Sequence, residues 1–454
     1  MQHSPDFAVT SQRVVTPEGE RAAAVLIKGE KILDVVSIQN IPEGCPTEDM
    51  GNDVVMPGLV DTHVHINEPG RADWEGFETA TRAAGAGGIT TLVDMPLNCI
   101  PVTTTVDALH RKIASTQNKL WIDCGFYGGL IPDNLDEVES LAEAGVIGFK
   151  AFMSHSGIDE FPKVTEKYLR KALPILAQQG IPLLVHAELE DGAEITEVSQ
   201  TYESYLASRP KSWENKAIKL LIQLCREFQT PIHIVHLSSS EVLTEIAQAR
   251  EEGLPLSVET CPHYLHFTAE GISDGDTRFK CAPPIREADN RERLWGGLES
   301  GAIDFIASDH SPCSPELKKL ETGDFGNAWG GISSLQFTLS VIWTECKKRN
   351  YSLVQLADWL CKEPAKLLWE NNFKGEISPG FFADLVIWDP DATFVVEPSV
   401  IHHKNKLTPY EGEKLFGVVK KTFLRGRKIF ENGEFLTGPS GKTLLRNHNV
   451  SRKA

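Results

Sequence analysis

Short apolar runs alternate with helix-length amphipathic segments through the middle of this chain, at intervals of about thirty residues. This rhythm is typical of consecutive βα units, in which each helix returns the chain to the start of the next parallel strand. We expect strands over residues 58–65, 89–94, 121–127, 146–152, 181–186, 231–236, 254–259 and 302–309. Helices are expected between them, over residues 75–86, 103–114, 134–144, 165–179, 214–228, 240–251 and 289–299. Eight such units predict an α/β fold of the (β/α)8 TIM-barrel type.

An open, doubly wound parallel sheet is the alternative fold for such repeats. Sheets of that kind that bind dinucleotides carry a Gly-x-Gly-x-x-Gly turn directly after a strand. None of the expected strands is followed by that turn. The barrel is therefore favoured, and the open sheet remains the second choice.

Both ends of the chain contain short strand-like runs without any helical pattern between them. These runs cover residues 7–15, 22–28, 31–36, 383–389 and 417–430. We expect both ends to build one small β-sandwich, with two unrelated tails as the alternative. The predicted domains are residues 1–55 and 376–435 for the sandwich and 56–375 for the barrel, followed by a poorly ordered polar tail over 436–454.

Composition restricts the partners of the chain. With 41% hydrophobic and 24% charged residues, the 454-residue chain resembles soluble proteins with a large core. A net charge of −18 argues against nucleic acid and anionic membranes, so a small neutral ligand is expected. Nine scattered cysteines without a Cys-x-x-Cys pair are predicted to be reduced packing residues. Neither a signal peptide nor an apolar run long enough to span a membrane is apparent, which predicts a cytoplasmic protein.

Side chains that bind metals recur at the carboxyl ends of the expected strands. Alternate residues of a strand share a face, so the histidines of Val60-Asp61-Thr62-His63-Val64-His65 point the same way. Catalytic groups of barrels gather at this end of the strands. Taken singly, each residue has an ordinary explanation as a strand histidine, a helix cap or a surface lysine, but their coincidence on five strands favours a metal site. The candidate ligands are His63, His65, Lys150, His186, His236 and Asp309.

Lys150 is the unusual member, because an apolar strand is a poor place for an ammonium group. Burial lowers the pKa of an amine, and a neutral amine adds carbon dioxide to form a carbamate with two oxygen atoms. We therefore predict N6-carboxylysine at position 150, bridging two divalent cations. Imidazole and carboxylate ligands favour Zn²⁺, with Co²⁺, Ni²⁺, Mn²⁺ and Fe²⁺ as alternatives. In this prediction the cations are held by His63, His65 and Asp309 on one side and by His186 and His236 on the other.

Several motifs make the chain similar to a known family. They are Met56-Pro57-Gly58 with His63-Val64-His65, Asp94-Met95-Pro96-Leu97-Asn98, Gly148-Phe149-Lys150, Cys261-Pro262-His263-Tyr264-Leu265, Lys280-Cys281-Ala282-Pro283-Pro284-Ile285-Arg286, Ser308-Asp309-His310-Ser311-Pro312-Cys313, Trp329-Gly330-Gly331 and Gly380-Phe381-Phe382-Ala383-Asp384-Leu385-Val386. Over nearly its whole length the chain resembles the cyclic amidohydrolases of the amidohydrolase superfamily, and most closely the allantoinases. The resemblance implies the same six metal ligands and the hydrolysis of allantoin to allantoate in purine catabolism, by a homotetramer.

The resemblance also implies residues that bind the substrate. Loops of this family hydrogen-bond the ring through backbone groups, which here correspond to Cys281, Ala282 and Gly330. In the related dihydropyrimidinases, a tyrosine five residues after the bridging lysine stabilises the tetrahedral intermediate. His155 stands at that position here, and it is predicted either to donate to the oxyanion or only to line the loop.

The choice of substrate depends on residues near the first histidine pair. Dihydroorotases resemble this chain but place an arginine two residues after the second histidine, where it pairs with the carboxylate of dihydroorotate. Here the position is Asn67, which suits the neutral ureido group of allantoin or only caps the turn over residues 68–70. Asn98 is a further candidate for binding the substrate, and its motif, Asp94-Met95-Pro96-Leu97-Asn98, looks more like that of allantoinases than that of dihydroorotases.

Asp309 is predicted to act as both base and acid, accepting the proton of the attacking hydroxide and delivering it to the leaving ring nitrogen. A purely structural ligand is the alternative role for this carboxylate. Two other activities stay open, those of dihydroorotase and of hydantoinase or dihydropyrimidinase. A protein of another class is also possible, a non-catalytic adaptor related to dihydropyrimidinase, although such adaptors lack the metal ligands that are present here.

Overall fold

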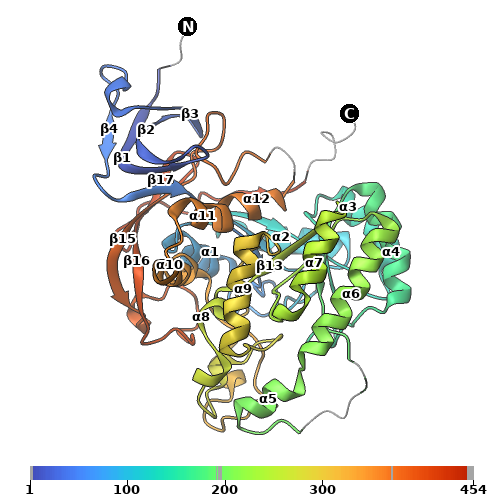
Figure 1. Ribbon diagram of the computed structural model, residues 1–454. Coiled ribbons are helices and arrows are strands. Elements are labelled where there is room, and N and C mark those ends of the chain that lie inside the picture. Colours follow the sequence, from blue (N-terminus) through green and yellow to red (C-terminus); the bar gives the residue numbers. More distant parts are fainter. Residues whose placement is uncertain (1–3, 191, 193–196, 370–371, 447–454) are drawn as a thin grey trace.

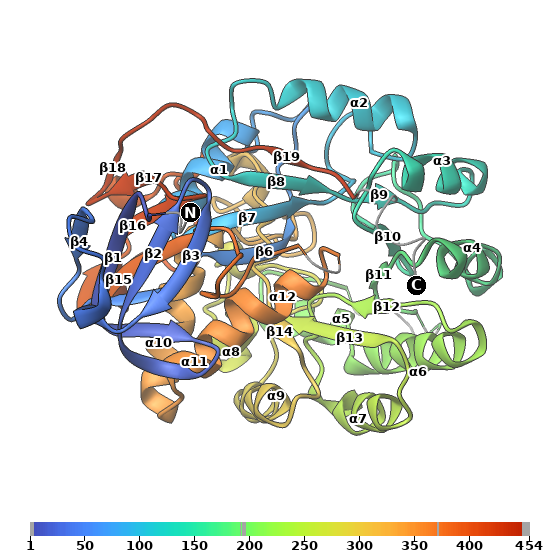
Figure 2. The same cartoon turned by 90° about the horizontal axis from the view of Figure 1, so that it is seen from above.

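The computed structural model describes residues 4–190, 192, 197–369 and 372–446. Parallel strands lie at the centre of the described chain, and helices pack around their outside (Figure 2). A second sheet, built from the two ends of the chain, lies to one side (Figure 1). The fold is thus mixed α/β with a β-rich part, as predicted.

The central strands are parallel and occur in two runs, β6 to β8 and β9 to β14. Each of the eight expected strands overlaps one of them. Their bounds are β6 Leu59–Val64, β7 Ile89–Asp94, β8 Asp123–Phe126, β9 Gly128–Gly129, β10 Phe149–Phe152, β11 Leu183–His186, β12 Ile232–Ile234, β13 Leu256–Thr260 and β14 Phe305–Ile306. The eighth strand is much shorter than expected, because the segment after Ile306 turns to present Asp309 instead of continuing the ladder.

Backbone hydrogen bonds connect the two runs. The nitrogen of Ile147, just before β10, donates to the carbonyl of Phe126 in β8 at 2.9 Å. At the other side, the nitrogen of His65 donates to the carbonyl of His310 at 2.8 Å, next to a parallel bridge between Val64 and His310. The ends of the first and eighth strands therefore lie side by side.

Helices follow the central strands and cover them from outside (Figure 2). The seven expected ranges overlap α1 Phe77–Ala86, α2 Val106–Ser115, α3 Val138–Glu143, α4 Glu166–Gln179, α6 Lys211–Phe228, α7 Leu243–Glu251 and α9 Ala288–Ser300. In α4, the buried residues Leu169, Leu173 and Leu176 recur at helical spacing, which explains why such helices were recognisable. No helix in the described ranges combines the length and apolar character that a membrane crossing requires.

Other helices were not anticipated. They are α5 Tyr202–Ser208, α8 Pro262–His266, α10 Thr338–Arg349, α11 Leu353–Ala357 and α12 Glu363–Lys366. In α10 every residue from Thr338 to Cys346 is buried, so this helix lacks the polar face that makes a helical pattern visible. All nine cysteines are free and all but Cys45 are buried, which confirms their prediction as packing residues.

The lateral sheet joins the two ends of the chain. Its strands follow the order β18-β17-β16-β15-β5-β1-β2-β3, with β4 beside β1. Their bounds are β1 Phe7–Thr16, β2 Gly19–Lys28, β3 Lys31–Val36, β4 Thr47–Asp49, β5 Val54–Pro57, β15 Leu385–Val395, β16 Lys414–Leu424, β17 Arg427–Glu431 and β18 Glu434–Phe435. Val9 and Val25 share a buried apolar cluster with Leu385 and Ile387. Because β5 leads directly into β6, this sheet anchors the strand that carries His63.

The tail differs from its prediction. Thr443–Leu444 forms β19, which pairs in parallel with β8, so the expectation of a poorly ordered tail is wrong here. The buried carboxylate of Asp123 accepts a hydrogen bond from the nitrogen of Lys442 at 2.8 Å, and Arg425 donates to the carbonyl of Ser440 at 2.6 Å. The polar composition gave no sign of these distant partners. The part of the predicted tail over 447–454 lies outside the described residues.

Candidate metal centre

The six predicted metal ligands meet at one end of the central strands. They lie at or just after the ends of β6, β11, β12 and β14, and within β10. All six are buried, and all six line one cavity of about 540 Å³. These residues are His63, His65, Lys150, His186, His236 and Asp309.

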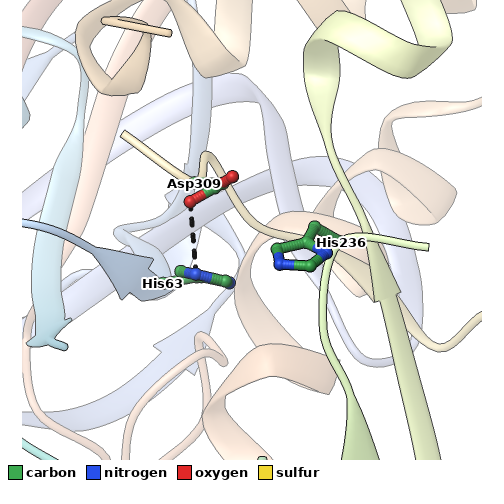
Figure 3. Close-up of side chains that lie close together, drawn as sticks. All are labelled: His63, His236 and Asp309. Atoms are coloured by element: carbon green, nitrogen blue, oxygen red, sulfur yellow. Dashed lines mark ion pairs between the residues drawn. The ribbon is translucent and has the colours of Figure 1, made fainter. Parts of the chain in front are cut away.

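Asp309 lies between the two histidines of the first strand. Its Oδ1 atom is 3.2 Å from Nε2 of His63 and 3.5 Å from Nε2 of His65. Figure 3 shows His63 and Asp309 facing one another beside His236, with metal-capable atoms of all three within 4.8 Å. Nε2 of His63 has no hydrogen-bond partner in the described part of the chain. This donor set suits a divalent cation.

His186 and His236 form the second pair. Nδ1 of His186 lies 3.0 Å from Nε2 of His236, while Nε2 of His186 donates to Glu188 at 2.6 Å. Burial lowers the pKa of both histidines, that of His236 to well below its ordinary value. Both rings are therefore neutral at pH 7. Since the Nε2–H of His186 donates to Glu188, the lone pair of Nδ1 points toward His236, as in a metal-binding histidine.

Lys150 is buried without a polar partner. Burial lowers the pKa of its amine to about 8, although Asp309 and Glu259 oppose this shift. Its Nζ atom has no hydrogen-bond partner among the described residues and lies 5.0 Å from the centre of the Phe152 ring. An unpaired buried amine is costly, which is consistent with a group that is covalently modified or bound to a cation.

Two candidate ligands have strained backbones. The φ angle is 40° at His236 and 45° at Asp309, in the left-handed region that side chains other than glycine rarely adopt. Such conformations cost about 1–3 kcal/mol each and persist where the surrounding structure imposes them. Here the sharp turns after β12 and β14 direct both side chains into the cavity.

Four of the other predicted site residues line the same cavity, namely Asn98, His155, Ala282 and Gly330. The side-chain amide of Asn98 lies 3.2 Å from Nδ1 of His65. The side chain of His155 is 66% exposed at the mouth of the cavity, and its Nδ1 accepts a hydrogen bond from the nitrogen of Gly157 at 3.1 Å. Its Nε2 atom lies 3.6 Å from the carboxylate of Asp159.

The other two predicted substrate-binding residues are engaged elsewhere. Nδ2 of Asn67 donates to the carbonyl of Pro312 at 3.2 Å, and the backbone carbonyl of Cys281 accepts a hydrogen bond from the hydroxyl of Tyr205 at 2.6 Å. Both residues are buried. Asn67 therefore ties the loop after β6 to the loop after β14, a contact that was not predicted.

Comparison with known proteins decides the family. The model of a family described as "Amidohydrolase family" matches residues 54–429. The chain belongs to the amidohydrolase family. This amidohydrolase is 48% identical to an allantoinase of Streptomyces avermitilis, over 97% of this chain and 99% of that protein. It is 45% identical to an allantoinase of Arabidopsis thaliana, over 97% and 91%, and 42% identical to one of Saccharomyces cerevisiae, over 97% and 99%.

Solved structures agree with this assignment. The amidohydrolase is similar to an L-hydantoinase (dihydropyrimidinase) from Arthrobacter aurescens, with a TM-score of 0.90 and 32% identity, over 97% of this chain and 100% of that one. A D-hydantoinase structure matches with a TM-score of 0.86 and 28% identity, over 98% and 99%. The predicted resemblance to cyclic amidohydrolases is confirmed.

Glu259 was not predicted as a site residue, although its carboxylate contacts two of the candidate ligands of this amidohydrolase. Its carboxylate accepts a hydrogen bond from Nδ1 of His63, lies 3.0 Å from Nε2 of His233 and accepts from the backbone nitrogen of His236 at 3.3 Å. Burial favours the neutral acid, but His63 and His233 hold its pKa at about 2. Its position in the sequence could have indicated a role in the site, because Glu259 ends the seventh expected strand and catalytic groups of barrels gather at that end.

Glu188 and Arg209 were also missed. Arg209 lines the cavity, and its Nε atom donates to Glu188 at 3.1 Å. The pKa of Glu188 is far below its usual value, since Arg209 and His186 outweigh the effect of burial. This pair fixes His186 and neutralises the guanidinium group beside the cavity.

Glu259→Gln is expected to weaken cation binding by about 10–100-fold, because carboxylates that orient a metal-binding histidine typically contribute that much. Competition with a chelator measures the affinity. Glu241→Gln, which changes an exposed glutamate after β12, is the matched control. Equal affinities in the Glu259 variant and the control would contradict a supporting role.

Proposed function

We propose that this amidohydrolase opens the hydantoin ring of allantoin and releases allantoate. The observation that carries the proposal is the identity of 42–48% to allantoinases of three organisms, over nearly the whole chain. The six metal-capable residues around one cavity support it. A hydrolase of cyclic amides needs such a centre to attack an unreactive amide carbon.

The unpaired buried atoms support a centre with two divalent cations, for which Zn²⁺ is the preferred ion. We propose that His63, His65 and Asp309 hold one cation, and that His186 and His236 hold the other. Bound cations supply Lewis acidity and lower the pKa of water to about 7. Carboxylated Lys150 would supply a carbamate oxygen to each cation. The carbamate forms when the neutral amine attacks carbon dioxide: an N–C bond forms, one C=O π bond becomes a carboxylate oxygen, and the nitrogen releases a proton.

The proposed roles of the other side chains follow from their positions. Burial alone would raise the pKa of Asp309, but His63 and His65 hold it well below its ordinary value, so the carboxylate is ionised. Ser311 orients it by donating to Oδ1 at 2.8 Å. Asp309 takes the proton of the nucleophile and returns it to the leaving ring nitrogen. His155 donates to the oxyanion, while Asn98 and the backbones of Ala282 and Gly330 bind the ring amides.

We further propose that the central strands form a closed (β/α)8 barrel, which the hydrogen bond between His65 and His310 supports. The apolar cluster shared by both chain ends supports a β-sandwich with domain boundaries near residues 55, 375 and 435. A homotetramer and a cytoplasmic location remain predictions.

For the substrate, we expect kcat/KM for allantoin to exceed that for dihydroorotate by at least about a hundredfold. A buried carboxylate without a cationic partner costs roughly 3 kcal/mol, which corresponds to that ratio. Asn67 supplies no charge, and Lys150, which lines the cavity, is carboxylated in this proposal. The other two basic side chains of the described lining, Arg209 and Lys280, have partners of their own. Arg209 pairs with Glu188, and Lys280 donates to the carbonyls of Gly326 and Ala328 at 3.1 and 2.7 Å.

Steady-state kinetics of the purified protein on allantoin, dihydroorotate, hydantoin and dihydropyrimidines tests this expectation. Comparable efficiency on dihydroorotate, or faster turnover of hydantoin than of allantoin, would overturn the substrate assignment and leave the metal centre intact. Metal analysis tests the non-catalytic adaptor, which predicts that the purified protein contains no bound cation.

A further inference from the structure

A second group of metal-capable side chains shares Asp309. Cys261 follows β13 directly, and His263 lies in the short helix α8. Ligand atoms of Cys261, His263 and Asp309 all lie within 4.8 Å of one another, and all three residues are buried. The mechanism proposed above uses neither Cys261 nor His263.

The imidazole of His263 has no polar partner. Neither Nδ1 nor Nε2 has a hydrogen-bond partner in the described part of the chain, although the residue is 0% exposed. The ring of Tyr264 lies edge-on at 4.2 Å between centroids, and its hydroxyl donates to the carbonyl of Pro283 at 2.6 Å. Buried polar groups are nearly always hydrogen-bonded, so the unpaired imidazole of His263 indicates a binding site for a ligand.

We propose that Cys261, His263 and Asp309 form an inhibitory site for a third, thiophilic divalent cation such as Zn²⁺ or Cd²⁺. A thiolate, an imidazole and a carboxylate are three typical zinc ligands, and they leave a fourth position for water. Tetrahedral bonds of about 2.0–2.3 Å place ligand atoms roughly 3.3–3.8 Å apart, so small side-chain rotations complete the site.

Inhibition follows from the shared carboxylate. Asp309 lines the active cavity and also belongs to the group with Cys261 and His263, so a cation bound by this group occupies a side chain of the active cavity. A cation bound there draws Asp309 away from His63 and occupies the oxygen that the reaction needs. This loss of turnover rests on the proposed function, whereas binding of the cation does not. Hard cations such as Mg²⁺ avoid thiolates and are expected to have no effect.

Titration of the zinc-loaded full-length protein with Cd²⁺ tests the site. We expect one further equivalent to bind without release of zinc, an ultraviolet Cd–thiolate charge-transfer band, and a fall in allantoin turnover of about tenfold or more. Mg²⁺ at the same concentration should change none of these. Cys261→Ser and His263→Gln should each weaken the binding of Cd²⁺ by about tenfold or more, with inhibition measured against the variant's own rate.

Cys346→Ser is the matched control, because Cys346 is a buried free cysteine in α10 that belongs to neither group of ligands. The Cys346→Ser variant should still show the Cd–thiolate band and should still be inhibited by Cd²⁺. An unchanged band in Cys261→Ser, or displacement of zinc with no additional equivalent bound, would overturn the proposal. Should Cys261→Ser fail to fold, unchanged Cd²⁺ affinity in His263→Gln would overturn it equally. The Cd–thiolate band and the number of Cd²⁺ equivalents bound are measured without substrate. An enzyme that is inactive on allantoin would therefore refute the proposed function and leave the cation site untouched.

Discussion

Lys150→Ala is expected to lose both cations and to lower kcat by about a thousandfold or more. In the proposed centre, carboxylated Lys150 would bridge the two cations, and its amine is buried, without a hydrogen-bond partner among the described residues, and has a pKa lowered to about 8. A metal centre contributes several kcal/mol to stabilising the transition state, and about 4 kcal/mol corresponds to a thousandfold in rate.

Metal content and kcat are measured on the same preparation. Short carboxylic acids such as acetate should restore part of the turnover in the variant, because a free carboxylate can occupy the space of the lost carbamate. Lys167→Ala, at an exposed position of α4, is the control and should behave like the wild type. The prediction fails if the Lys150 variant keeps two cations and most of its activity, or if a crystal structure of the metal-loaded enzyme has a free amine at Lys150.

Much of the fold was predictable because it is encoded locally. Expected strand 89–94 coincides with β7, and the leucines of α4 recur on one buried face. The convergence of His63, Lys150 and Asp309 required only the rule that catalytic groups follow parallel strands, because in a barrel those ends meet on one face. The bounds of short strands such as β14 were less well predicted, since its ladder ends at Ile306, before the left-handed backbone at Asp309.

The features that could not be predicted from the sequence depend on contacts between residues far apart in the chain. The pairing of β19 with β8 requires Asp123 and Arg425, which lie far apart in the chain. The role of Glu259 depends on its contact with His63 across 196 residues. The turn of Asn67 toward Pro312 likewise joins two loops that only the fold brings together. Local sequence patterns contain no information on such contacts. They therefore predict helices, strands and the cluster of candidate ligands, but not the side chains that position those ligands.

Asp309→Asn is expected to lower kcat by about 10²–10⁴-fold while KM changes little, because moving a proton stabilises the transition state and not the bound substrate. An amide keeps the shape of the carboxylate but cannot accept the proton. Metal content must be measured alongside, since Asp309 also lies 3.2 Å from His63 in the centre. Asp289→Asn, at an exposed position of α9, is the matched control.

An Asp309→Asn variant that holds both cations and turns over at nearly the wild-type rate would exclude Asp309 as the base. If reloading the variant with metal restores full turnover, Asp309 is a structural ligand, and the proton must leave by another group that lines the cavity.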